Sequence, residues 1–324
     1  TPDRNTGEVL KRVSGASIQD NKFVVVRGLS DRYNQALLNN ALMPSSEPDK
    51  KAFSFDVIPA AMIDNIIINK TATPDLPGEF AGGLVQINTK DIPTRNFLTI
   101  GASLGFNTQS AFQDFVSNER GSTDYLGFDD RRSIPSSYPM KYGVYNTLPA
   151  EERRQISADF RDDVWAEQTS VAGPVQSYNL TWANAVRSEK GGAFGSVIGI
   201  TYRNSKLIYN ATKELFERDG QQAFFSYADQ QNKYSTTVGA LANFAWTKRN
   251  HKVAFKNLFN QLYEDNYYTR EGYNTNRRND IQFFSSYLNQ RSLFSTQLEG
   301  EHQLTAKGIK FKWNGNAGLN WKKQ

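Results

Sequence analysis

Residues 309–321 read IKFKWNGNAGLNW, a stretch in which apolar and polar side chains alternate. Because successive side chains of a β-strand point to opposite faces, this alternation predicts a strand with one apolar and one polar face. A lysine that faces the middle of a bilayer costs about 2–4 kcal/mol, so in a membrane barrel these lysines should point inward or lie near an interface. The apolar face carries Ile309, Phe311, Trp313, Ala317, Leu319 and Trp321, and the polar face carries Lys310, Lys312, Asn314, Asn316 and Asn320.

Six further segments carry related alternation, and most have the roughly 9–11 residues that a tilted strand needs to cross a bilayer. Together they predict the first seven or so strands of an antiparallel transmembrane β-barrel. Seven strands leave an open edge whose backbone groups lipid cannot satisfy, so we expect the barrel to continue beyond Gln324. The six segments are residues 97–106, 175–186, 193–202, 238–246, 252–260 and 287–302.

The connections between these segments alternate in length. Tight turns are expected at residues 188–192, 248–250 and 305–308. The other connections are expected to be long, which is typical of outer-membrane barrels with short periplasmic turns and long extracellular loops. Within the first of them, a helix after Thr147 and Pro149 is expected to pack Ile156, Phe160 and Val164 on one face. The long connections run over residues 107–174, 204–234 and 261–285, and Trp182, Trp246, Trp313 and Trp321 are expected in the aromatic girdles.

The first part of the chain has a different pattern. Short apolar runs at residues 23–27, 66–69 and 84–89 predict buried strands, and a short helix is expected from Pro59. Segments rich in Gly and Pro, at residues 39–51 and 73–83, predict irregular structure between them. We therefore expect a mixed α/β domain over residues 1–93 and the barrel portion over residues 94–324.

Composition excludes several classes of function. The chain of 324 residues has no Cys and only two His, so neither a disulfide nor a metal site with recognisable ligand spacing is expected. The net charge of +5 is spread along the chain, which disfavours a nucleic-acid partner. No apolar run is long enough for a membrane-spanning helix, and the mean hydropathy of −0.61 suits a barrel or a secreted β-sandwich. The alternating loop lengths favour the barrel.

No catalytic residues are predicted. Residues 101–105, GASLG, match a nucleophile-elbow pattern in letters, but Ser103 lies inside an alternating strand rather than at a sharp strand-to-helix turn. The chain also starts at Thr1 without Met or an apolar signal core, so we expect its N-terminus to be processed or truncated.

A set of motifs in the first domain resembles the plug domain of the TonB-dependent receptors, particularly the versions common in the Bacteroidota. The resemblance implies a plug inside a 22-stranded barrel, in the outer membrane of a Gram-negative bacterium. It also implies import driven by the TonB complex of the inner membrane, without a cofactor. The motifs are VRGLSDRYN at residues 26–34, LLNN at 37–40, IP at 58–59, IDNI at 63–66 and TPDLPGEFAGGLVQINTK at 73–90.

The resemblance also implies two groups of site residues. An Arg and a carboxylate in a polar lumen can pair reversibly, which suits a lock between plug and wall. Aromatic and Arg side chains at the plug apex and in the third long connection could stack on a ligand. The implied lock comprises Arg27, Gly28, Asp64, Gly78, Glu79, Gly82 and Gly83, and the candidate ligand contacts are Arg32, Tyr33, Asn34, Tyr267, Tyr268, Arg270 and Tyr273.

Alternatives remain open at this stage. The cargo of an importer could be a siderophore, a glycan or a peptide. The expected partners are the TonB complex and outer-membrane lipids, and a surface lipoprotein is a further candidate. The first rival function is a plugged barrel that serves as a structural or secretion-associated subunit without import. The second rival is an outer-membrane hydrolase, which would need a catalytic set on further strands.

Overall fold

The computed structural model describes residues 6–19, 23–43, 45, 53, 55, 58, 60, 63–74, 76–89, 93, 95–189, 191–216, 223–304 and 308–323. The chain is mostly β, with a small N-terminal domain followed by one large antiparallel sheet, as expected. Within the described ranges, no helix is both long and apolar enough to cross a membrane. The expected helix from Pro59 lies outside these residues.

The N-terminal domain, called the plug below, contains two small sheets. One is the antiparallel pair β1–β2, and the other has the strand order β4-β3-β6-β5, with β3 parallel to β6. The three predicted strands are all present, as β2, β5 and β6. Its elements are α1 (Thr6–Leu10), β1 (Ala16–Gln19), β2 (Phe23–Val26), η1 (Asp31–Tyr33), β3 (Asn34–Leu38), β4 (Ala41–Leu42), β5 (Ile63–Asn69) and β6 (Gly83–Thr89).

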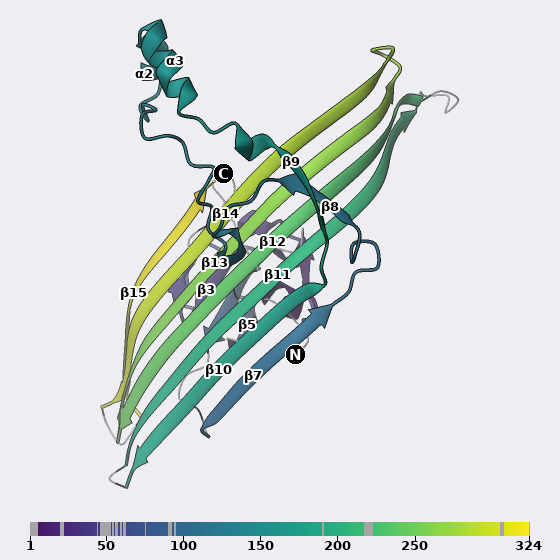
Figure 1. The fold of residues 1–324 in the computed structure, drawn as a ribbon. Coiled ribbons are helices and arrows are strands. Elements are labelled where there is room, and N and C mark those ends of the chain that lie inside the picture. Colours follow the sequence, from purple (N-terminus) through teal and green to yellow (C-terminus); the bar gives the residue numbers. More distant parts are fainter. Residues whose placement is uncertain are drawn as a thin grey trace.

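The second part, called the wall below, is a seven-stranded sheet with the order β15-β14-β13-β12-β11-β10-β7. Every neighbouring pair is antiparallel, and all seven predicted strands are confirmed. Figure 1 shows the plug lying behind the inclined wall. The strands are β7 (Phe97–Gly105), β10 (Val175–Ser188), β11 (Gly192–Phe216), β12 (Ala223–Lys248), β13 (His251–Asn274), β14 (Asn279–Gln303) and β15 (Lys310–Lys323).

The prediction of long connections is wrong for two of the three segments, residues 204–234 and 261–285. The strands β11 to β14 have 24–26 residues each and take up most of residues 204–234 and 261–285. The ladder between β13 and β14 runs without a register shift up to Asn274 and Asn279. These extensions carry polar side chains on both faces, so they lack the apolar alternation that identified the lower parts of the strands.

The remaining long connection, residues 107–174, folds against the wall. Figure 1 shows it in front of the sheet, on the face opposite the plug. The predicted helix is present as α3, where Ile156 is buried; Val164 is buried in η5, whereas Phe160 is 45% exposed. Its elements are β8 (Asp114–Asn118), η4 (Asp124–Leu126), α2 (Val144–Thr147), α3 (Ala150–Ala158), η5 (Asp163–Trp165) and β9 (Glu167–Val171).

The face of the wall opposite the plug carries an apolar band, called the lipid band below. Strand register aligns its side chains in rows, from the row of Phe194 and Trp246 up to the row of Tyr202 and Val238. On β12 this distance is nine residues, which matches the roughly 9–11 residues of a tilted strand across a bilayer. Trp246 and Trp313 lie at the tight-turn end and Trp321 at the other end, as predicted for girdles, whereas Trp182 pairs with Ile198 in mid-band.

The polar side chains near this band have partners. Lys310 and Lys312 lie on the plug-facing side, where both Nζ atoms approach Glu301, at 3.1 and 3.5 Å. This placement agrees with the inward direction predicted for them. Asn257 lies within the band, but its Oδ1 accepts a hydrogen bond of 2.8 Å from Thr296 Oγ1. Neither the charges nor the amide is therefore left unsatisfied in lipid.

Replacing Ile198 by Lys tests the position of the lipid band. Ile198 stands in its central row, so the charge should lower the free energy of unfolding from lipid vesicles by about 2–4 kcal/mol. Asn210→Lys places the same charge on the same strand and face, but beyond the band, and should have little effect. The measurement is a urea titration of the reconstituted protein, with Ile198→Ala to separate the loss of packing. Equal effects of the two lysines would show that the band is misplaced.

Candidate functional site

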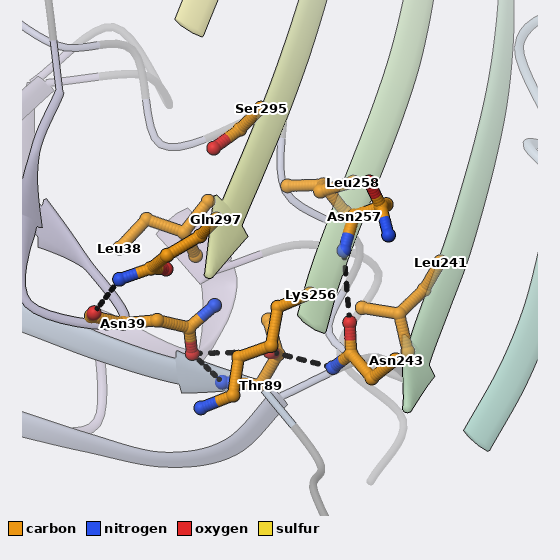
Figure 2. A pocket seen from close by; sticks show the side chains of 10 residues that line it. All are labelled: Leu38, Asn39, Thr89, Leu241, Asn243, Lys256, Asn257, Leu258, Ser295 and Gln297. Carbon is orange, nitrogen blue, oxygen red and sulfur yellow. Dashed lines mark hydrogen bonds between the residues drawn. The ribbon is translucent and has the colours of Figure 1, made fainter. Parts of the chain in front are cut away.

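The contact between plug and wall is the best-defined polar site of the molecule, and it is called the seam below. Figure 2 shows side chains of the plug turned toward side chains from three neighbouring wall strands. Nothing in it resembles a catalytic arrangement. The seam is lined by Leu38, Asn39, Thr89, Leu241, Asn243, Lys256, Asn257, Leu258, Ser295 and Gln297.

The plug enters the seam with the tip of a tight hairpin. Leu38 of β3 pairs with Ala41 of β4, so Asn39 and Asn40 form a two-residue loop. Both have positive φ, 49° and 67°, as a type I′ turn requires. Asn tolerates this conformation better than most residues, because its short polar side chain can hydrogen-bond locally. The sequence thereby places an amide side chain at the tip.

Asn39 joins the two long plug strands to the wall. Its side-chain Oδ1 accepts hydrogen bonds from Thr89 N at 2.8 Å and from Thr89 Oγ1 at 3.0 Å, at the end of β6. Its backbone oxygen accepts a hydrogen bond from Gln297 Nε2 on β14 and a longer one, 3.4 Å, from Asn314 Nδ2 on β15. One residue with 4% exposure therefore links the β3–β4 hairpin to three other strands, β6, β14 and β15.

A second set of hydrogen bonds continues into the wall. Asn243 Nδ2 of β12 donates to Thr89 Oγ1 at 2.9 Å, and Asn243 Oδ1 accepts from the backbone N of Asn257 at 3.1 Å. The Thr89 hydroxyl thus donates to the plug and accepts from the wall. Further along, Asn320 Nδ2 donates to Ser45 O at 2.8 Å. These plug–wall bonds join neutral groups, each contributing about 0.5–1.5 kcal/mol.

Apolar contacts surround these hydrogen bonds. The core cluster contains plug residues such as Leu38 and Ile87 together with Leu241, Leu258 and Leu293 of the wall, all at most 4% exposed. Within the wall, Lys256 Nζ lies 2.7 Å from Glu299 Oε1. The seam is therefore a water-excluding patch with a few specific polar links, which holds the plug without a covalent bond.

The residues implied as a plug lock lie in turns of the plug, except Asp64 in β5 and Gly83 at the start of β6. Arg27 and Gly28 have positive φ, 56° and 72°, in the exposed turn after β2. Gly83 leaves no room for a side chain, since an added Cβ would lie 2.8 Å from Val26 Cγ1.

The acidic members of this set are exposed. Asp64 accepts a hydrogen bond of 3.0 Å from Asn65 Nδ2, and Glu79 is also exposed. Gly82 sits against Asn34, and Gly78 has open space around it. Their role as a lock remains a prediction.

The candidate ligand residues of the plug differ in their surroundings. The Arg32 guanidinium lies 5.2 Å from the ring centre of Tyr33, which is 44% exposed. Asn34 is buried, and its Nδ2 donates to the backbone oxygens of Val24, Leu29 and Ser30. Asn34 therefore stabilises the turn between β2 and β3. Its amide nitrogen already donates to plug oxygens.

The candidate ligand residues of β13 do not form a single cluster, because strand alternation separates them. Arg270 faces the plug side, where it makes two hydrogen bonds of 2.7 Å to Asp229 and one of 2.6 Å to Tyr268. Its guanidinium also lies 4.9 Å from the ring centre of Tyr227. Tyr267 points to the opposite face and donates to Glu167 at 2.7 Å. Tyr273 lies on the same face of β13 as Tyr267 and is 47% exposed.

Some of the seam residues carried a signal in the sequence. Asn39 and Asn40 follow Leu37 and Leu38, an arrangement typical of a hairpin turn between apolar strands. Gln297 and Asn243 carried none, because they lie more than 150 residues from their plug partners. No group of three or more His, Asp or Glu side chains that could hold a metal ion occurs in the described part of the chain.

The architecture described so far, a small α/β plug against one face of an antiparallel membrane wall, defines the class of plugged outer-membrane barrels. Residues 1–85 match the family model of the TonB-dependent receptor plug domain. The resemblance drawn from the motifs is thereby confirmed for residues 1–85, which form a TonB-dependent receptor plug domain.

The chain is also similar to solved structures of outer-membrane transporters and receptors. The chain matches the outer membrane transporter YddB from Escherichia coli with 8% identity over 98% of this chain and 50% of that one, at a TM-score of 0.34. It matches the ferric citrate transporter FecA with 11% identity, coverage of 99% and 58%, and a TM-score of 0.32. The siderophore receptor PirA from Pseudomonas aeruginosa shares 11% identity, with coverage of 98% and 54% and a TM-score of 0.28. The chain thus spans 50–58% of the length of these proteins, and no curated protein matches it.

Replacing Asn39 by Ala tests the seam. The variant loses both hydrogen bonds to Thr89 and keeps a strained positive φ, so the plug should be less stably held by roughly 2–4 kcal/mol. The measurement is the urea concentration at which ion conductance through the protein rises in a planar bilayer. Asn65→Ala is the control, because the described hydrogen bonds of its side chain join Asp64 and Asn88, neither of which lines the seam. A midpoint shared by both variants would contradict the role of Asn39.

Proposed function

We propose that this protein is an outer-membrane transporter of a Gram-negative bacterium that imports a nutrient through the TonB complex of the inner membrane. The observation that carries the proposal is the plug of a TonB-dependent receptor held at the seam by neutral hydrogen bonds and apolar contacts. Such contacts are individually weak, so a pulling force can separate them one after another and they re-form afterwards.

The plug-facing side of the long strands is the proposed ligand surface. It presents Tyr227, Tyr268 and Phe283 around the Arg270–Asp229 pair. Aromatic rings and a held guanidinium can stack on and hydrogen-bond to a siderophore, a glycan or a peptide. Outer-membrane lipids surround the wall in this proposal, and a surface lipoprotein is a further candidate partner.

The test is uptake by the native host under iron limitation, on glycans and on peptides. Deleting the gene should abolish the use of one nutrient class, and loss of TonB should have the same effect. Nutrient use that is unchanged by deletion under all three conditions would refute import and favour the structural or secretion-associated subunit. Loss of uptake that does not depend on TonB would refute the energy source alone.

Replacing Arg270 by Lys tests the proposed ligand surface. Lysine keeps the charge but cannot form the two parallel hydrogen bonds to Asp229 or stack as a plane on Tyr227. We expect the nutrient concentration for half-maximal uptake to rise by about tenfold, which corresponds to roughly 1.4 kcal/mol of binding. Arg277→Lys, in the neighbouring exposed turn, is the matched control and should change little. Equal uptake by the two variants would move the ligand elsewhere.

A further inference from the structure

The wall strands extend well beyond the lipid band. Above the row of Tyr202 and Val238, the side chains on the face opposite the plug become polar, beginning with Asn204, Thr236 and Tyr263. A bare polar surface at this height would belong in water. Here it is covered by residues 107–132 and 163–172 of the first connection, which is called the collar below (Figure 1).

Several direct hydrogen bonds fasten the collar to the wall. Ser110 Oγ accepts from Ile208 N at 2.8 Å, and Gly127 O accepts from Gln261 Nε2 at 2.6 Å. Gly127 has positive φ, 88°, and an added Cβ would lie 2.9 Å from Gln261 Cγ. The close approach of the collar at this point thus depends on glycine.

The collar turns its charges toward the wall. The side chains of Arg132, Asp124 and Asp265 are 13%, 2% and 2% exposed, and Arg132 Nη1 lies 3.2 Å from Asp265 Oδ2. The guanidinium of Arg120 lies 3.6 Å from the ring centre of Tyr234. Burial raises the pKa of Asp124 above its usual value. These charges form a buried network between collar and wall.

Phe115 of the collar packs against the wall, but four other large apolar side chains of the collar are exposed. Phe112 is 67% exposed, Tyr125 56%, Leu126 42% and Phe128 45%. The collar thus buries Asp124 and Arg132 against the wall and exposes four large apolar groups, while Asp114, Asp130 and Glu167 are exposed beside them. This distribution suits an element whose outer surface meets lipid.

The position of these side chains relative to the lipid band agrees with contact with lipid. Gly127 is bonded to Gln261, which stands in the same register row as Tyr202 and Trp321, at the upper end of the lipid band. The ring of Phe112 lies 6.2 Å from that of Phe106, which follows β7 and extends its outward apolar row. The exposed collar residues therefore continue the apolar band.

We propose that the collar dips into the outer leaflet of the membrane, with Phe112, Tyr125, Leu126 and Phe128 forming the upper aromatic girdle together with Tyr178, Tyr202 and Trp321. Its occupant is lipid. The first connection then serves as a clamp that seals the lipid-facing side of the wall at the leaflet surface, and its helical arm around α3 extends beyond it (Figure 1).

The absence of Cys in the chain allows a clean test with single labels. Leu126→Cys and Phe128→Cys carry a small fluorophore in the full-length protein, reconstituted in phosphatidylcholine–phosphatidylglycerol vesicles. Ile200→Cys, in the lipid band, is the lipid-exposed control, and Tyr142→Cys, fully exposed just before α2, is the water-exposed control. Quenching is measured with spin-labelled phosphatidylcholine and with aqueous iodide.

Both collar labels should be quenched several-fold more by the lipid quencher than the label at position 142, and should be protected from iodide like the label at position 200. Iodide quenching equal to that at position 142 would overturn the proposal, because it would place the collar in water. Protection from both quenchers would overturn it as well, since a protein surface would then cover these residues. Two collar positions keep the result independent of one variant that folds poorly.

Discussion

An uninterrupted backbone ladder is the constraint on which the other features depend. Inside a bilayer, no water satisfies a free amide or carbonyl, so strands that cross it must pair along their whole length. The six strand pairs of the wall meet this requirement, and between β12 and β13 the register is continuous from Phe225 to Lys248. Once register is set in this way, every side chain is committed to one face. The positions of the seam, the lipid band and the collar all follow from that commitment.

The same strand therefore serves two environments with alternate residues. On β12, Leu241 and Asn243 meet the plug, while Ala242 and Phe244 face the other way. A shift of one residue would expose Asn243 to lipid and press Phe244 against the plug, so the two functions stabilise each other's register. The seam bonds that cross from wall to plug join amides, a hydroxyl and backbone groups rather than charges, which avoids the large desolvation cost of buried ions. A plug that must detach is better held by such bonds.

The lower half of the wall could be predicted from sequence, because lipid imposes an apolar residue at every second position. The upper half could not, since Asn, Thr, Gln and Tyr in β11 to β14 occur on both the collar-facing and the plug-facing sides, without any period in hydropathy. Those residues therefore resembled loops. In the plug, the motifs were visible, but the hairpin at Asn39 and Asn40 was predicted only as the start of an irregular segment, and Gln297 and Asn243 were not recognised. Their partners are brought near only by the closing of a sheet across more than 150 residues.

The role of an aromatic side chain in the wall depends on whether it faces the plug or the opposite side. Tyr267 and Tyr268 are neighbours in sequence, yet one bonds to the collar through Glu167 and the other to Arg270 on the plug side. Tyr125 and Phe128 lie in a nominally extracellular connection, and their exposure alone would suggest ligand contacts. The collar segment that carries them, however, packs on the face of the wall opposite the plug. Of the four β13 candidates for the proposed ligand surface, Tyr268 and Arg270 face the plug side, whereas Tyr267 and Tyr273 face away from it.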